Sequence, residues 1–140
     1  MFYYVEPEVA GGIGPKSETL REHGALVVTR LNYEFDGWLG DALLESTPCF
    51  IVTDDARQLV EAADLSGVHF ADVEVTGSPT FADLYPTREL PSFRWMVVDG
   101  TLHRDDFAIA HDKRLVVSER ALATLKAAGI DHAIVEPAPA

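Results

Sequence analysis

The sequence predicts a single-domain α+β fold over residues 1–140, and three observations predict it. A chain of 140 residues has the length of one domain. With 47% hydrophobic and 24% charged residues, its composition is that of a globular protein with a core. Short apolar runs with strand character also alternate with stretches of helical periodicity. We therefore expect a mixed or antiparallel sheet packed by helices.

The first third of the chain is rich in predicted strands. The run FYYV at 2–5 predicts a first strand, and ALVVTRLNYEF at 25–35 predicts one or two more. Between them, the glycine-rich segment EVAGGIGPKSE at 8–18 predicts a loop. The segment GWLGDALLES at 37–46 predicts a short helix, with inward positions at Leu39, Leu43 and Leu44.

Two similar strand-helix-strand units are predicted at 49–75 and 114–137. In each, a buried strand ends at a hydroxyl residue, Thr53 or Ser118, and an acidic residue and an amphipathic helix follow. A hydroxyl in this place accepts a hydrogen bond from an unpaired backbone N–H, so we interpret Ser118 as a helix N-cap and not as a nucleophile. The match, at a shift of 65 residues, leaves open whether the units are a duplication or two similar solutions.

The segment between these units supplies the remaining elements. VHFADVEV at 68–75 alternates with one irregularity, which predicts an edge or bulged strand. Ser78 predicts the cap of a helical turn that has Pro79 at its first position. Two further strands, SFRWMVV and DFAIA, are predicted on either side of a loop around Gly100.

The negative charge lies in the middle of the chain. Net charge is −12, of which residues 31–86 contribute −10 because eleven acidic residues there face one basic residue. Nucleic-acid binding needs clustered Lys and Arg, so this charge argues against a nucleic-acid partner. It favours either simple solubility or attraction to a basic protein partner.

The sequence also bears on location. The start, MFYYVEPEVA, lacks the basic region of a signal peptide and carries acidic residues, and no apolar run reaches membrane-spanning length. We expect a cytoplasmic protein with no membrane association. The single cysteine, Cys49, cannot form an internal disulfide and is interpreted as a small buried apolar residue.

One cluster could carry chemistry, and its members are acids and imidazoles within ten residues: His103, Asp105, Asp106, His111 and Asp112. On a strand and its following turn, at most two of these side chains would face a common metal ion. The glycine segment GGIG at 11–14 has the wrong spacing for a nucleotide fingerprint. We predict no catalytic set, no cofactor and no metal site.

Three stretches together resemble a known family: YYVEPEVAGGIG, the segment from FDGWLGDALLES to FADVEV, and the segment from LPSFRWMVVDG to HAIVE. In their layout they resemble the immunity-protein family of bacterial polymorphic toxin systems, and the resemblance spans most of the chain. It implies a small α+β protein that binds a cognate toxin domain and blocks it by stoichiometric, non-catalytic association.

The candidate partner-binding residues are acids near an aromatic side chain in the acidic segment: Glu34, Asp36, Trp38, Asp41 and Glu45. Tryptophan beside charge is an enriched combination at protein interfaces. Trp38 is equally suited to a place in the core. Two other functions stay open, namely a small-ligand or metal-binding module using residues 103–112 and a structural subunit of a homo-oligomer.

Overall fold

The computed structural model describes residues 1–139 and has an α+β fold, as the sequence predicts. Three helices are present in this part of the chain: α1 (Asp54–Ala62), α2 (Pro79–Leu84) and α3 (Glu119–Ala128). The strands are β1 (Phe2–Glu6), β2 (Gly11–Ile13), β3 (Glu18–Glu22), β4 (Ala25–Arg30), β5 (Asn32–Phe35), β6 (Leu43–Ser46), β7 (Cys49–Thr53), β8 (Val68–Ala71), β9 (Glu74–Gly77), β10 (Phe93–Val98), β11 (Phe107–Ile109), β12 (Leu115–Ser118) and β13 (Ile134–Pro137). None of the helices in residues 1–139 combines the length and the apolar character needed to cross a membrane.

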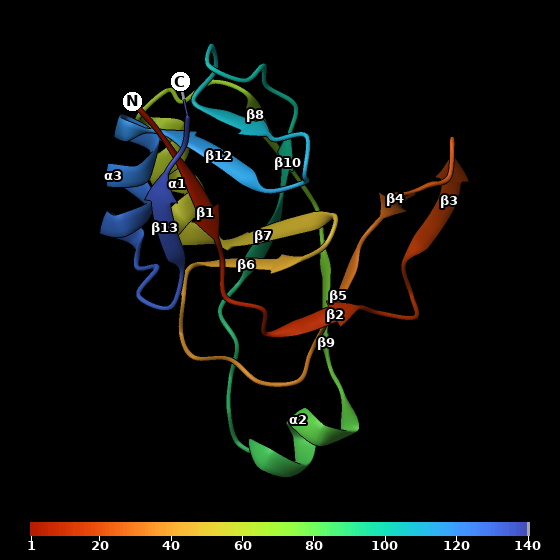
Figure 1. Ribbon diagram of the computed structural model, residues 1–140. Coiled ribbons are helices and arrows are strands. Elements are labelled where there is room, and N and C mark those ends of the chain that lie inside the picture. The colour runs from red at the N-terminus through yellow and green to blue at the C-terminus, as the bar shows by residue number, and fades with distance from the viewer. Residues whose placement is uncertain (140) are drawn as a thin grey trace.

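The strands form three sheets and one hairpin (Figure 1). The first sheet has the strand order β11-β12-β1-β13, and we call it the β1 sheet. The β7 sheet has the order β6-β7-β10-β8, and the β5 sheet has the order β2-β5-β9. Strands β3 and β4 pair only with each other and form a hairpin that projects from the body. All pairs are antiparallel except β5 with β9, so the sheets are mixed or antiparallel as predicted.

The β7 sheet lies between two hydrophobic cores because its side chains alternate between faces. Phe50, Val52 and Met96 pack into the larger core with α1, α3 and the β1 sheet. Ile51 and Phe93 point to the other face, into a second core with the β5 sheet and α2. The structure thus stacks its layers on both sides of one sheet.

The predicted helix caps are confirmed. The Thr53 hydroxyl accepts a hydrogen bond from the Ala56 N–H at 3.2 Å, and Ser118 accepts from the Ala121 N–H at 3.1 Å. Ser78 caps α2 in the same way, with Pro79 at the first helical position. The hydroxyl of Ser118 is therefore part of a structural junction.

Helices α1 and α3 lie side by side on one side of the molecule (Figure 1). The strands that flank each helix do not pair with each other. Strand β10 separates β7 from β8, and β1 separates β12 from β13, and each separating strand is antiparallel to both neighbours. Each helix thus crosses over one intervening strand.

The predicted helix at 37–46 is wrong. Residues 37–42 have no regular structure, and β6 begins at Leu43. Gly40 has a φ of +106°, which a helix does not tolerate. Leu43 and Leu44 are both buried, but they enter different cores from opposite faces of a strand, while Leu39 is exposed. The spacing of the leucines suited a helix by coincidence.

Two further predictions need correction. The loop predicted at 8–18 contains β2, where a Cβ on Gly11 would lie 1.9 Å from the Glu34 carbonyl oxygen, so only glycine allows this close strand pairing. The single bulged strand predicted at 68–75 is two strands, since β8 belongs to the β7 sheet and β9 to the β5 sheet. The chain changes sheets at the irregularity near Asp72.

Candidate functional site

The candidate site is the segment that joins β5 to β6, residues 36–42, which we call the 36–42 loop. Glu8, just after β1, is only 6% exposed and contacts the loop from the interior of the protein. Its carboxylate accepts hydrogen bonds from the Leu39 N–H at 2.6 Å and the Asp41 N–H at 3.2 Å. A single buried carboxylate therefore satisfies two backbone donors in a loop without regular structure.

Asp41 ties the loop to the turn between α3 and β13. It is 3% exposed and accepts hydrogen bonds from the His132 backbone N–H and from the His132 Nδ1, both at 2.8 Å. The hydrogen bond to Asp41 raises the pKa of His132, and the negative charges of Asp41 and Glu8 act in the same direction. The protonated imidazole is thus favoured in the folded protein.

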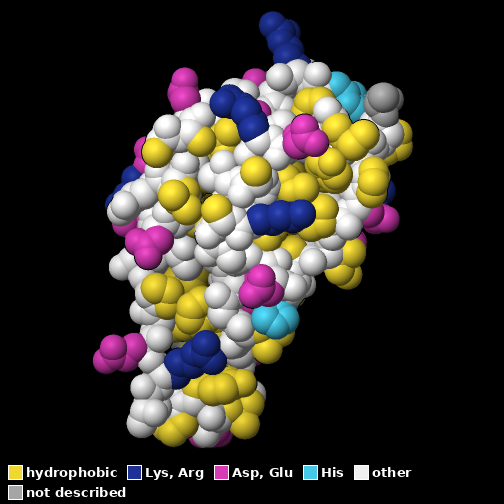
Figure 2. All heavy atoms as spheres, turned by 90° about the vertical axis from the view of Figure 1, so that its left-hand side faces the viewer, with side chains coloured by type: hydrophobic (Ala, Val, Ile, Leu, Met, Phe, Trp, Pro, Cys, Tyr) yellow, Lys and Arg dark blue, Asp and Glu magenta, His cyan; other side chains and the backbone are white. Residues whose placement is uncertain are grey.

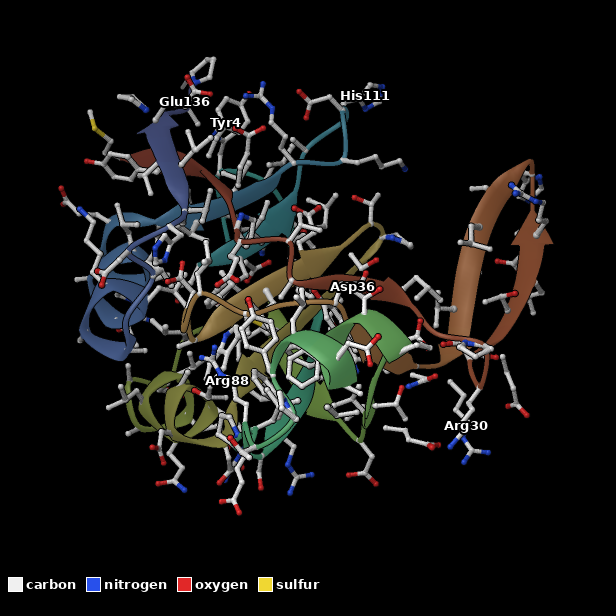
Figure 3. The ribbon with its side chains drawn as sticks, turned by 90° about the horizontal axis from the view of Figure 1, so that it is seen from below. Tyr4, Arg30, Asp36, Arg88, His111 and Glu136 are labelled. Atoms are coloured by element: carbon white, nitrogen blue, oxygen red, sulfur yellow. The ribbon has the colours of Figure 1, made fainter. Side chains whose placement is uncertain are left out.

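Trp38 and Arg88 fix the outer side of the loop. The Trp38 Nε1–H donates to the Asp41 carbonyl at 3.0 Å, and the ring packs edge-on against Phe93 of the second core. The Arg88 guanidinium donates to the Trp38 carbonyl at 2.9 Å and lies 4.9 Å from the centre of the Trp38 ring. Figure 3 shows Arg88 from below, among the side chains around α2. The loop is held at its backbone and at its one aromatic side chain.

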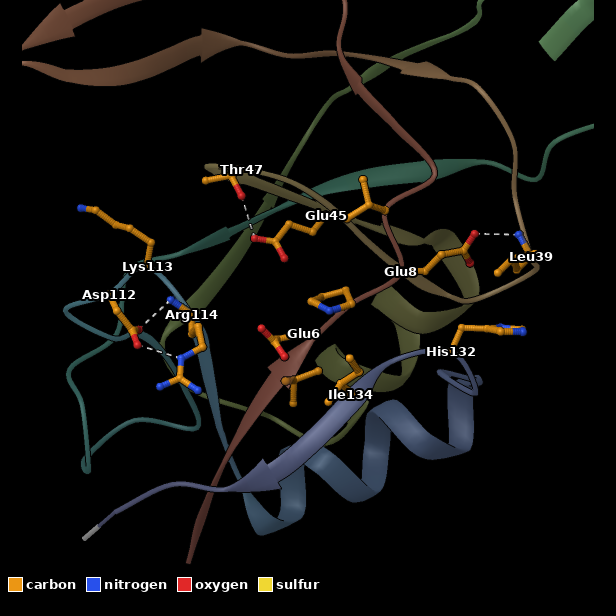
Figure 4. Close-up of a pocket in the computed structure, with 13 residues that line it drawn as sticks. Glu6, Glu8, Leu39, Glu45, Thr47, Asp112, Lys113, Arg114, His132 and Ile134 are labelled. Carbon is orange, nitrogen blue, oxygen red and sulfur yellow. Dashed lines mark hydrogen bonds and ion pairs between the residues drawn. The ribbon is translucent and has the colours of Figure 1, made fainter. Parts of the chain in front are cut away.

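The loop presents Leu39 to solvent beside a hollow of about 740 Å³ (Figure 4). The Leu39 side chain is 66% exposed, and the exposed apolar residues Val9 and Ile134 also line the hollow. Glu6 and Glu45 line it as well, and burial together with the nearby Glu6 raises the pKa of Glu45. Lys113 and Arg114 line it too, and Arg114 pairs with Asp112. This surface therefore combines apolar contact area with charges of both signs, and its carboxylates outnumber its Lys and Arg side chains.

The five residues proposed from the sequence as partner-binding differ in their exposure and contacts. Trp38 is half-buried, so it serves both the second core and the surface of the loop. Asp36 is exposed at the end of β5, and Glu45 is half-buried in β6. Glu34 is half-buried within the β5 sheet. Asp41 is the exception, because its buried carboxylate is engaged by His132 and is not a surface charge.

Part of the acidic charge of residues 31–86 is neutralised within the fold. Arg57 pairs with Asp54 and Glu61, and Arg94 pairs with Asp72. On the face shown in Figure 2, acidic side chains stand singly among hydrophobic and basic ones. The charge on this face is therefore spread and forms no continuous acidic field.

Residues 103–112 are distributed over separate contacts. Asp106 is buried and accepts hydrogen bonds from the Ser66 N–H, from the Ser118 hydroxyl and from the Arg120 guanidinium. Burial opposes ionisation of Asp106, but these hydrogen bonds outweigh it and lower its pKa to about 2. Asp106 therefore joins the segment between α1 and β8 to the cap of α3.

The other members of that cluster point elsewhere. Asp105 accepts from the Thr101 N–H, and Asp112 pairs with Arg114. The exposed His103 packs edge-on against Phe2, and His111 is also exposed. This arrangement offers little geometric support to the metal or small-ligand module considered for residues 103–112.

Within residues 1–139, one group of three side chains has ligand atoms close enough for a metal ion, and it is Glu8, Asp41 and His132. These atoms all lie within 4.8 Å of one another. Both carboxylates already accept backbone hydrogen bonds, and the His132 Nδ1 is paired with Asp41. A cation would have to displace the bond between His132 and Asp41, so we interpret the group as the structural anchor of the loop.

Sequence reasoning missed Glu8, Arg88 and His132, the three side chains that hold the 36–42 loop. Their partners lie 31, 50 and 91 residues away along the chain. Local periodicity carries no information over such separations. The available signal was the segment DGWLGD itself, whose two glycines are more typical of a shaped loop than of a helix.

Comparisons with known proteins add no assignment. Neither the models of known protein families nor the curated proteins include a match to this chain.

Proposed function

We propose that the chain is an immunity protein that binds a cognate bacterial toxin domain stoichiometrically and neutralises it without catalysis. The observation that carries this proposal is the 36–42 loop, an irregular segment held by Glu8, Arg88 and His132. It also lies within one of the stretches that resemble the immunity-protein family.

Rigid presentation of an exposed side chain is what a tight binder needs. A loop that is ordered before binding loses less conformational entropy when the complex forms. Leu39 is held outward by the hydrogen bond from its own backbone N–H to Glu8. A few well-packed side chains near the centre of an interface contribute most of the affinity, and Trp is enriched among them. Leu39 and the exposed part of Trp38 are the proposed contacts.

The hollow beside the loop favours a basic partner. Its lining includes the apolar residues Val9 and Ile134, and its carboxylates outnumber its Lys and Arg side chains, with Glu6, Glu8, Glu45 and Asp112 against Lys113 and Arg114. A Lys or Arg side chain has an apolar stem and a cationic head, so it matches both kinds of lining. The exposed Asp36 adds negative charge at the start of the loop. We propose that the toxin domain is basic and that binding takes place in the cytoplasm.

A binding experiment with the toxin domain encoded beside this gene tests the proposal. Calorimetry should give one-to-one binding, and co-expression of the chain should protect cells from the toxin. A double variant, Asp36→Asn with Glu45→Gln, should slow association at low salt and have less effect at high salt. Asp41 is left unchanged in this variant because its carboxylate is buried. No binding by the wild type would reject the immunity function.

We also propose that segments 49–75 and 114–137 are related units. Each has the order strand, capping hydroxyl, helix and strand, with one antiparallel strand between its two strands. A duplication would be supported by relatives in which the two segments are more similar to each other in sequence than they are in this chain. Relatives in which the segments share only the capping residue would contradict it.

A further inference from the structure

The structural anchor of the 36–42 loop brings together two negative charges and one group that can be positive. The carboxylates of Glu8 and Asp41 are buried, and one side-chain oxygen of each lies with a ring nitrogen of His132 in a group whose members are all within 4.8 Å of one another. Two anions at such a separation repel each other, and the repulsion is strong where water is scarce. A positive charge placed beside the two carboxylates therefore strengthens the anchor.

His132 is the group that supplies this charge. Among the ion pairs within residues 1–139, the one with His132 is the only one that involves Asp41, and none involves Glu8. The hydrogen bond to Asp41 raises the pKa of His132, and the charges of Asp41, Glu8 and Asp131 raise it further. Histidine changes its charge between about pH 5 and pH 8, whereas Lys and Arg stay positive there. The charge balance of the anchor therefore depends on pH.

The other charged groups around His132 do not take over its role. Asp131 precedes it in the same turn, and Lys126 of α3 lines a separate hollow together with Asp131. Across the hollow beside the 36–42 loop, the other charged lining residues are Glu6, Glu45, Asp112, Lys113 and Arg114. Arg114 is already paired with two acids, and Figure 4 shows Lys113 on the opposite side of this hollow from His132. The positive charge at the anchor therefore comes from His132 itself.

We propose that the anchor is a pH-dependent latch, which holds the 36–42 loop in place while His132 is protonated and lets the loop open more often when His132 is neutral. A neutral His132 with its proton on Nδ1 keeps the hydrogen bond to Asp41 but no longer offsets the repulsion between Glu8 and Asp41. The backbone N–H groups of Leu39 and Asp41 then leave the Glu8 carboxylate more often. The inference concerns the loop itself, so it stands whether or not the loop contacts a toxin.

Amide hydrogen exchange of the purified full chain, measured at about pH 5.5 and about pH 8 on either side of the ordinary histidine pKa, tests the latch. Each rate is divided by the intrinsic exchange rate of that amide at the same pH. The protection of the Leu39 and Asp41 amides should fall about two- to fivefold at the higher pH, which is the range expected for a partly exposed ion pair. His132→Asn keeps a side-chain donor without a titratable charge, so this fall should disappear. The matched control is His111→Asn, because His111 is exposed and lies outside the anchor, and it should behave as the wild type does.

A second measurement needs no variant. In an NMR titration of the wild type, the amide signals of Leu39 and Asp41 should shift with the same midpoint as the His132 ring. The two loop amides should also be less protected than those of α1 at both pH values, because the loop opens without unfolding of the whole protein. Protection in the wild type that does not change with pH would overturn the proposal. The same fall in a folded His132→Asn, or loop amides as protected as those of α1, would also overturn it.

Discussion

The substitution Glu8→Gln tests whether one buried carboxylate organises the 36–42 loop. Glu8 accepts two backbone hydrogen bonds, from Leu39 at 2.6 Å and from Asp41 at 3.2 Å. Glutamine has nearly the same shape but only one acceptor oxygen. Its amide nitrogen would face one of these N–H groups, and two donors would then oppose each other in a buried place.

The expected cost follows from these two bonds. A hydrogen bond to a charged group contributes about 1.5–3 kcal/mol, and glutamine keeps one of the two in weaker form. Loss of the negative charge also reduces repulsion with Asp41, which offsets part of the cost. We expect Glu8→Gln to lower the free energy of unfolding by about 1–3 kcal/mol. The control is Glu45→Gln, because the Glu45 carboxylate is half-buried and bonds only to Thr47.

Chemical denaturation measures the free energies, and amide hydrogen exchange locates the change. The Leu39 and Asp41 amides should exchange faster in Glu8→Gln, whereas amides in α3 should exchange faster only to the extent of the global loss. The control should change the free energy of unfolding by less than about 0.5 kcal/mol. Unchanged exchange at Leu39 and Asp41 in Glu8→Gln would show that Glu8 does not hold the loop.

Thr53→Ala should destabilise the fold by about 1 kcal/mol, and Ser118→Ala by more, about 2 kcal/mol, because Ser118 both caps α3 and donates to Asp106; equal losses in denaturation would refute the second role. Ser118→Asp would cap the helix but repel Asp106, so it should destabilise as well, whereas a cap alone would predict a neutral change. The lowered pKa of Asp106, about 2 against an ordinary 3.8, supplies about 2 kcal/mol that is present above pH 4 and lost as pH falls toward 2, which an acid titration of stability in wild type and Asp106→Asn would detect. The pKa of His132 is raised, so its effect on stability depends on pH in the opposite direction: the stabilisation is complete below about pH 6.5 and is lost as the pH rises through the pKa of the folded protein. An NMR titration that gives an unshifted pKa for His132 would contradict this. Burial raises the pKa of the Cys49 thiol to about 12, so thiol reagents should label it only after unfolding, and rapid labelling of the native protein would contradict this.

Local patterns predicted most of the elements. The strand that ends at Thr53, the strand that ends at Ser118 and both following helices could be predicted because the signals are contiguous in the sequence. A cap, an acidic first turn and an apolar face act within one or two turns of helix. The burial of Cys49 followed from the same local reading.

The errors arose where distant residues decide the local structure. The leucines at 39, 43 and 44 have helical spacing, yet Glu8 and His132 hold the backbone of this segment in another form. Tertiary hydrogen bonds to buried carboxylates outweigh a weak helical preference. The same cause removes Asp41 from the proposed surface acids, because its partner His132 lies 91 residues away. Trp38 and Asp36 could be placed near the site from sequence alone because they belong to the loop itself.

The central claim is that the 36–42 loop contacts the toxin domain, and the affinity of Leu39→Ala tests it most directly. The matched control is Leu20→Ala, an exposed leucine on the hairpin, away from the loop. Both variants are titrated into the toxin domain by calorimetry, after circular dichroism has shown that each is folded. Leu39→Ala should bind about 10 to 100 times more weakly than the wild type, and Leu20→Ala should bind as the wild type does. Equal affinities of Leu39→Ala and the wild type would contradict the claim.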